Sequence, residues 1–211
     1  MVSRHPTLMM LVEAIAAHDR TLVDDLLIAS PGLAGARAEV GASRQVPEPY
    51  LESIEHYLYG GDTALHIAAA AYEPEIIHSL MANGAGVNVK NRRGAEPLHY
   101  AADGIPGSHA WNPAAQAETI RSLIEAGADP NAADKSGVTP LHRAIRTRCA
   151  EAVRALLDGG ADPRRPNGKG TSPSQLAAIT SGRGGSGSEE AKAQQQVIVE
   201  LLEHHVAAQP K

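Results

Sequence analysis

"TPLHRA" at residues 139–144 is the stretch that decides the fold, because related versions of it recur along the chain. "TALHIA" stands at 63–68 and "EPLHYA" at 96–101, and a weaker copy, "SPSQLA", stands at 172–177. Catalytic residues are rarely present in several spaced copies, whereas the framework residues of repeat proteins are. The motif therefore indicates repeated architecture rather than an active site.

Two sets of glycines give the period of this repeat. The first set is spaced by 33, 43 and 33 residues, and the second, in which alanine follows each glycine, by 43 and 33 residues. The first contains Gly61, Gly94, Gly137 and Gly170, and the second contains Gly84, Gly127 and Gly160. Both sets share a period of 33 and one insertion of ten residues, which is typical of stacked helix pairs.

One repeat unit predicts its own helices. Thr139 is a good N-cap, and Pro140 suits the first helical position, where a missing N–H donor costs nothing. Apolar residues then recur at helical spacing, namely Leu141, Ala144 and Ile145. A second helix is expected near 150–158, ended by the glycines that follow it. Helices this short are stable only against neighbours.

On these residues, the segment 58–170 resembles three ankyrin repeats, and "GVTPLHRAIRTRCAEAVRALLDGGADPRRPNGKG" at 137–170 is close to a consensus unit. The whole chain also resembles bacterial ankyrin-repeat proteins, which brings no established activity with it. The resemblance implies an all-α solenoid of stacked helix pairs with β-hairpin-like finger loops. We expect about five repeats, including degenerate caps.

We expect residues 1–211 to form a single ankyrin-repeat domain. Its predicted parts are a degenerate N-terminal repeat at 7–33, a loop plus an extra helix at 34–57, a repeat at 58–92, a repeat with an insertion at 93–136, a repeat at 137–169, and a C-terminal capping repeat with an insertion at 170–207. The extra helix is expected within 49–59 because apolar residues stand there at helical spacing, namely Leu51, Ile54 and Leu58.

The resemblance implies a structural role for the motif histidines His66, His99 and His142, alongside Thr139 and Pro140. In the family, the matching histidine joins loops of neighbouring repeats by hydrogen bonds. A neutral imidazole can do this because one ring nitrogen donates and the other accepts. Equivalent positions in stacked repeats lie about 10 Å apart, too far to share one metal ion. We therefore expect no metal site and no cofactor.

Finger tips and the exposed face of each first helix form the usual recognition surface of the family. The resemblance places the following residues there: Tyr59, Lys90, Arg92, Arg93, Asp103, Lys135, Arg146 and Lys169. This strip is basic in the middle, so it predicts an acidic protein partner steered by charge. The alternative is that these charges only keep the fingers soluble.

The insertion "DGIPGSHAWNP" at 103–113 carries Trp111, the only tryptophan. Tryptophan is enriched at binding hot spots, but the ring could equally fold back and cover the helix pair. His109 and Asp103 supply two possible metal ligands, too few for a site. The other insertion, "SGRGGSGS" at 181–188, lacks the strand and the lysine of a phosphate loop, so we expect a flexible loop.

Composition narrows the functional classes. The formal net charge is −5, but residues 1–89 carry 4 basic and 11 acidic side chains, whereas residues 90–170 carry 12 and 9. Cys149 is the only cysteine, which excludes an internal disulfide and fits a reducing, cytoplasmic location. No apolar run reaches 18 residues, so no membrane span is expected. Nucleic acid is disfavoured by the negative charge and by the lack of aromatics in the strip.

The sequence thus predicts a non-catalytic, monomeric protein–protein interaction scaffold. One alternative is a small-ligand-binding or regulatory module, or an enzyme, that uses the insertions around Trp111 as a pocket. Convergence of Asp103, His99 and Trp111 would favour that alternative. Another is a bacterial effector or an antitoxin-like neutralising binder. Because fold does not imply function, the choice depends on a site.

Overall fold

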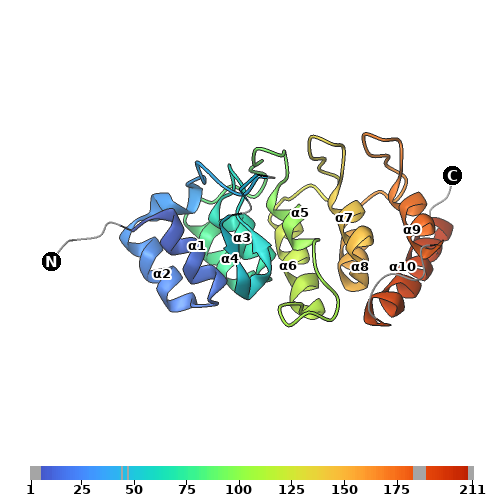
Figure 1. Cartoon of the computed structure of the whole chain (residues 1–211), viewed down its shortest axis with the longest axis horizontal. Coiled ribbons are helices and arrows are strands. Elements are labelled where there is room, and N and C mark those ends of the chain that lie inside the picture. The colour runs from blue at the N-terminus through green and yellow to red at the C-terminus, as the bar shows by residue number, and fades with distance from the viewer. Residues whose placement is uncertain (1–5, 44, 47, 183–188, 209–211) are drawn as a thin grey trace.

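The computed structural model describes residues 6–43, 45–46, 48–182 and 189–208. Short helices dominate the described chain, and one pair of two-residue strands accompanies them (Figure 1). In chain order the elements are α1 (Leu8–Ala16), α2 (Arg20–Ala29), the 3-10 helix η1 (Pro31–Gly35), β1 (Tyr50–Leu51), the 3-10 helix η2 (Glu52–Ile54), β2 (His56–Tyr57), α3 (Ala64–Ala70), α4 (Pro74–Ala82), α5 (Pro97–Ala101), α6 (Pro113–Glu125), α7 (Pro140–Thr147), α8 (Ala150–Asp158), α9 (Pro173–Gly182) and α10 (Glu189–Ala208).

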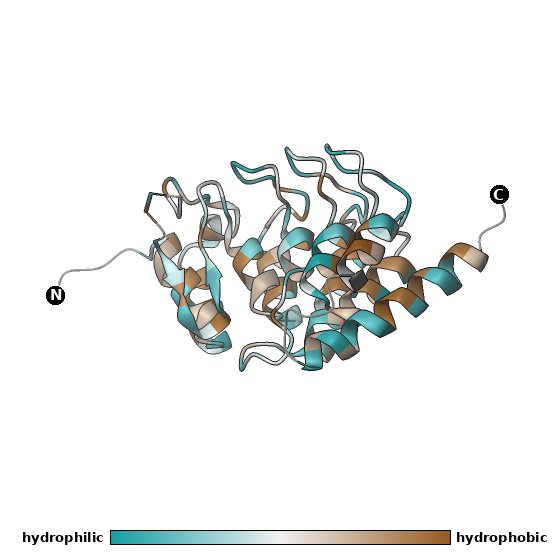
Figure 2. Ribbon diagram, turned by 45° about the vertical axis from the view of Figure 1, so that its right-hand side comes forward, coloured by the Kyte–Doolittle hydropathy of each residue, from teal (hydrophilic) through white to brown (hydrophobic). Residues whose placement is uncertain are grey.

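These helices form antiparallel pairs that stack side by side along the long axis of the molecule (Figure 1). The pairs are α1–α2, α3–α4, α5–α6, α7–α8 and α9–α10, and each contacts the next. Finger loops project from one edge of the stack, and Figure 2 shows them as largely hydrophilic above helices with apolar inner faces. The predicted all-α solenoid of stacked pairs is confirmed, while the boundaries assigned to single repeats stay a prediction.

Small apolar side chains form the core between the helices. All seven residues of α3, "ALHIAAA", are buried. Leucine or isoleucine fills the widest gaps, and alanine lets neighbouring helices approach closely without a bulky ring. This packing explains how a chain without phenylalanine closes its interior.

The start of α7 shows how one unit is built. The Thr139 side chain accepts a bond from the His142 backbone N–H at 3.4 Å, and the Thr139 backbone N–H donates to His142 Nδ1 at 3.2 Å. Pro140 occupies the first helical position. Two of the free N–H groups at the helix start are therefore satisfied locally.

The three motif histidines each join two units. Because Nδ1 accepts from a backbone N–H, the ring proton must lie on Nε2, which can then donate to a carbonyl. Each Nε2 reaches the finger of the following unit: His66 reaches the Ala95 carbonyl oxygen at 3.1 Å, His99 that of Val138 at 3.1 Å, and His142 that of Thr171 at 2.9 Å. Burial lowers the pKa of all three rings, for His99 to about 4, so the rings are neutral at pH 7.

The last helix pair replaces this histidine by glutamine. The Ser172 backbone N–H donates to Gln175 Oε1 at 2.9 Å, and the Gln175 backbone N–H donates to Ser172 Oγ at 3.3 Å. The amide therefore copies the bond that histidine makes at its own helix start. Helices α9 and α10 form the last pair of the stack, whereas residues 183–188 of the expected loop lie outside the described residues.

Backbone hydrogen bonds join the fingers to one another. The Lys135 N–H donates to the Arg93 carbonyl at 3.0 Å, and the Gly168 N–H donates to the Ser136 carbonyl at 2.8 Å. Gly137 has a φ of 72°, and a side chain there would lie 2.5 Å from the Gly168 nitrogen. Only glycine suits both conditions.

The helix expected within 49–59 is wrong. The segment forms an antiparallel hairpin, with Tyr50 paired to Tyr57, around the short helix η2. Glu55 adopts a left-handed backbone with a φ of 51°, which reverses the chain and is incompatible with a continuing α-helix. The three apolar residues that predicted the helix are still buried, namely Leu51, Ile54 and Leu58. The spacing of these residues therefore correctly indicated that they are buried, but not which secondary structure the segment adopts.

This hairpin and the chain before it form an insertion, residues 36–58, whose described part contacts the first and third helix pairs. Ser53 Oγ donates to the Ala16 carbonyl at 2.6 Å, and the His56 ring packs on Tyr100 of α5 with centroids 4.6 Å apart.

No helix of the described chain is both long and apolar enough to cross a bilayer.

Candidate partner-binding groove

A groove of about 600 Å³ lies between the fingers and the first helices α5 and α7. Six of the residues predicted to bind a partner line it, namely Tyr59, Arg92, Arg93, Asp103, Lys135 and Arg146. Ser136 and Val138, which occupy recognition positions of the same repeat, also line it. The structure adds residues that sequence reasoning did not select, namely His56, Asn91, Tyr100, Asp134 and Arg143. Five cationic side chains face only two carboxylates there, so the groove favours negatively charged groups.

Three predicted residues lie elsewhere. Lys90 stands outside the groove with its Nζ 3.6 Å from Glu96 Oε1. Lys169 is an exposed residue of the last finger, whose backbone N–H donates to Asn167 Oδ1. Trp111 lines a second cavity that adjoins the groove. Contact of any of these residues with a partner stays a prediction.

The two finger arginines have different surroundings. Arg92 Nη2 donates to the Glu39 carbonyl at 2.7 Å, so its guanidinium ties the insertion to the finger. The Arg93 guanidinium lies over the Tyr59 ring at 4.4 Å, a cation–π contact that keeps it at the rim of the groove. Arg93 can therefore meet a ligand without loss of a protein hydrogen bond, and Arg92 cannot.

Arg143 is the main residue that sequence reasoning missed. It follows His142 in the repeat motif, and its side chain is only 12% exposed. Nη1 donates to Asp103 at 2.7 Å, Nη2 lies 3.6 Å from Asp134, and the buried Nε has no partner among the described residues. Burial alone would lower the pKa of Arg143, but Asp103 and Asp134 outweigh it and raise the pKa, so the charge persists. Arg146 is more exposed and approaches Asp103 at 3.6 Å.

A buried polar network supports the floor of the groove. Tyr100 donates to Asp62 at 2.8 Å, and Asn91 Nδ2 donates to the same carboxylate at 2.9 Å. The Tyr59 backbone N–H adds a third bond at 2.7 Å. Burial and the Asp62 charge raise the pKa of Tyr100, so its hydroxyl stays a donor. The network holds Tyr59 and Tyr100 in place beneath the arginines.

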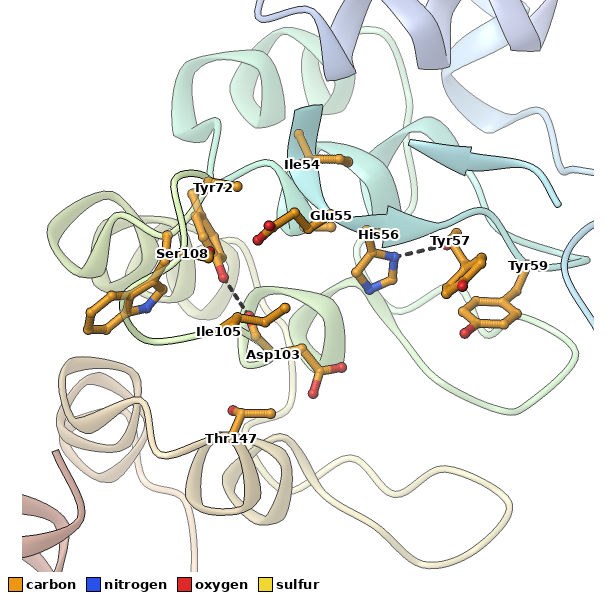
Figure 3. A pocket seen from close by; sticks show the side chains of 14 residues that line it. Ile54, Glu55, His56, Tyr57, Tyr59, Tyr72, Asp103, Ile105, Ser108 and Thr147 are labelled. Carbon is orange, nitrogen blue, oxygen red and sulfur yellow. Dashed lines mark hydrogen bonds between the residues drawn. The ribbon is translucent and has the colours of Figure 1, made fainter. Parts of the chain in front are cut away.

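The second cavity, of about 220 Å³, lies where the insertion meets the 103–113 loop (Figure 3). Trp111 lines it while Nε1 donates to Gln116 Oε1 at 3.1 Å on α6, so the ring both covers the helix pair and faces the cavity. Tyr72 donates to the Asp103 carbonyl at 2.6 Å, a bond drawn in Figure 3. Asp103 and Trp111 thus meet at this cavity, but His99 does not line it, because its ring is buried and bonded to the next finger.

The metal pair considered from sequence does not form, because His109 Nδ1 lies 3.4 Å from Glu55 while Asp103 binds arginines. Among the described residues, no group of three His, Cys, Asp or Glu side chains could hold a metal ion. Cys149 is buried, which raises the pKa of its thiol to about 11 and keeps it protonated.

Comparison with known proteins agrees with this helical repeat architecture. The family model described as "Ankyrin repeats (3 copies)" matches residues 65–167 and 108–185, together more than half of the chain. The chain therefore belongs to the ankyrin-repeat family. No curated protein matches it. Ankyrin repeats are generally protein–protein interaction modules and are typically non-catalytic.

Proposed function

We propose that this chain is a non-catalytic, monomeric scaffold that binds an acidic segment of a partner protein in the groove between the fingers and helices α5 and α7. The observation that carries the proposal is the convergence of Arg93, Lys135 and Arg146 on one groove of about 600 Å³. These three residues come from two fingers and a helix, so the fold gathers charges that are far apart in sequence.

The groove contains one cationic side chain that is held in place and three that are exposed to solvent. Arg143 is fixed by two carboxylates, whereas Arg93, Lys135 and Arg146 are exposed and can reorient. Carboxylates of a partner would approach these exposed cations under electrostatic steering, which raises the association rate most at low salt. Tyr59 and Arg93 provide residue types that are enriched at binding hot spots.

Two features support binding rather than catalysis. Cys149 is a buried, protonated thiol, and Asp103, a carboxylate of the groove, is bound to arginines instead of being poised as a base. The cavity beside Trp111 measures about 220 Å³, below the range of about 300–1,000 Å³ for sites that enclose a whole small ligand. The groove is therefore the better candidate for the main site.

The test is affinity capture from a lysate of the source cells with three baits. They are wild type, Arg93→Glu with Arg146→Glu, and the control Arg164→Glu with Arg165→Glu. The control makes the same change in net charge on exposed residues outside the groove. We expect a protein retained by wild type and by the control, released by added salt, and lost at least tenfold from the groove variant.

Equal loss from both double variants would show that net charge alone drives capture and would contradict a groove site. Equal retention by both would contradict the role of these arginines. Helical circular dichroism of all three baits checks that each is folded.

A further inference from the structure

The cavity of about 220 Å³ opens beside the groove, and the two share His56, Tyr59 and Asp103 along their border. Its walls come from four places: the insertion hairpin with Tyr59 after it, the end of α3 with Tyr72 after it, the 103–113 loop, and the end of α7. A chain lying in the groove therefore passes the mouth of this cavity. The cavity is too small for a whole small-molecule ligand but large enough for one long side chain.

Glu55 gives the cavity its charge. Its side chain is 22% exposed, and the left-handed backbone at this residue turns it away from the hairpin. Figure 3 shows the side chain extending from the hairpin toward the Tyr72 side of the cavity. Among the described residues, its only ionic partner is His109, at 3.4 Å, and the ring of His109 is 72% exposed. A largely buried carboxylate thus lacks a permanent cation.

Asp103, on the other side of the cavity, differs in this respect. Its carboxylate already binds Arg143 at 2.7 Å and approaches Arg146 at 3.6 Å. The charge of Asp103 is therefore satisfied within the chain, whereas that of Glu55 is open to a ligand. Burial of a charge without a partner is costly, so a cation that enters beside Glu55 would gain an ionic bond at little further desolvation.

The remaining walls suit the stem of a long cationic side chain. Ile54 and Ile105 are aliphatic, and Tyr72 and Trp111 present aromatic rings. Lysine and arginine bury their methylene stems along apolar surface while the charged end seeks a carboxylate, and aromatic faces attract cations. An uncharged aliphatic side chain would fill the same volume but would give the Glu55 carboxylate no ionic partner beyond the exposed His109.

We propose that this cavity binds one lysine or arginine side chain of the protein whose acidic segment occupies the groove. This proposal rests on the proposed function, because the side chain that enters the cavity belongs to the partner protein bound in the groove. The basic groove and the acidic cavity together then set the register of that chain, since a segment with its charges exchanged would be repelled at both positions.

The experiment titrates ¹⁵N-labelled protein with three blocked amino acids: N-acetyl-lysine methylamide, its arginine counterpart, and the uncharged norleucine counterpart. Trp111 supplies the only indole N–H of the chain, so its NMR signal reports directly on this cavity. The variants are Glu55→Gln, which keeps the shape and removes the charge, and the control Glu52→Gln, an exposed residue of the same hairpin.

We expect the lysine or the arginine probe to shift the Trp111 indole signal in wild type and in Glu52→Gln. The cationic probe should bind Glu55→Gln at least tenfold more weakly than wild type, and the norleucine probe should bind wild type at least tenfold more weakly than the cationic probe. The proposal is overturned if neither cationic probe moves the signal at about 50 mM, or if Glu55→Gln or norleucine binds as well. A preserved amide spectrum shows that Glu55→Gln is folded.

The blocked amino acids do not require the groove cations, so the two proposals can fail separately. Loss of probe binding with retained partner capture would overturn the cavity alone. Probe binding without any effect of Arg93→Glu and Arg146→Glu on capture would overturn the groove, and with it the assignment of the cavity to a chain bound there.

Discussion

Helices α5 and α7 begin with the same motif but present different surfaces. Their histidines, His99 and His142, make the same bonds at the helix start and to the next finger. The next residue is Tyr100 in α5, buried beneath His56 of the insertion, and Arg143 in α7, which faces the groove. The shared residues build the frame, and the residue after the histidine decides what the frame displays.

Both of these variable residues also bind an aspartate. Tyr100 donates to the buried Asp62, and Arg143 donates to Asp103 at the groove. The first pair stabilises the floor of the groove, and the second holds a largely buried cation in its wall. A repeat can therefore use one position either for stability or for recognition, depending on whether an insertion covers it.

The largest effect should come from breaking what the two helices share. His99→Ala leaves the Glu96 N–H and the Val138 carbonyl without their partners, which we expect to cost about 3 kcal/mol in the free energy of unfolding. Urea denaturation measures the change. His99→Gln should recover part of the loss, because Gln175 already makes the bond at a helix start. Equal losses in both variants would contradict the capping role.

The pH dependence of stability should be the next largest effect. Burial lowers the pKa of His99 from 6.5 to about 4, so the unfolded chain binds a proton more readily than the folded chain. Its contribution is present above pH 6.5 and is lost as the pH falls toward 4, about 2 kcal/mol between pH 7 and pH 5. Wild type should lose more stability than His99→Gln over this interval. Parallel pH profiles would show that His99 does not titrate as its burial implies.

The smallest effects should separate α5 from α7. Tyr100→Phe removes a hydrogen bond to the buried Asp62 carboxylate and should cost about 1.5 kcal/mol. Arg146→Ala removes an exposed cation 3.6 Å from Asp103 and should change stability by about 0.5 kcal/mol or less. Thermal unfolding of both variants measures this contrast. An Arg146→Ala loss as large as that of Tyr100→Phe would mean that the groove charges are structural rather than available for binding.

The repeat could be predicted because its signals are local. Thr139, Pro140 and His142 lie within one turn of the helix start that they form. The glycine in each finger turn is present because the backbone there has a positive φ. The hairpin at 50–57 could not be predicted in this way. Its apolar residues at helical spacing fit a helix equally well, and the left-handed backbone of Glu55 has no sequence signal.

The candidate site likewise contains residues that the repeat pattern could predict and residues that it could not. Family resemblance placed Arg93, Lys135 and Arg146 on one strip, because repeats carry equivalent positions forward along the chain. Arg143 was missed because the bond that gives it meaning, to Asp103, joins residues 40 apart. Glu55 was missed because the insertion that carries it matches no repeat position.

The sequence by itself determined the stacked helix pairs, the finger edge and the histidine positions, since each depends on contacts within one unit or between successive units at a constant period. Only the tertiary structure decided where the insertion lies, which first-helix residue it covers and which it leaves open, and how two carboxylates beside one cavity come to differ in charge balance. Those outcomes depend on contacts between residues far apart in the chain, which no local pattern records.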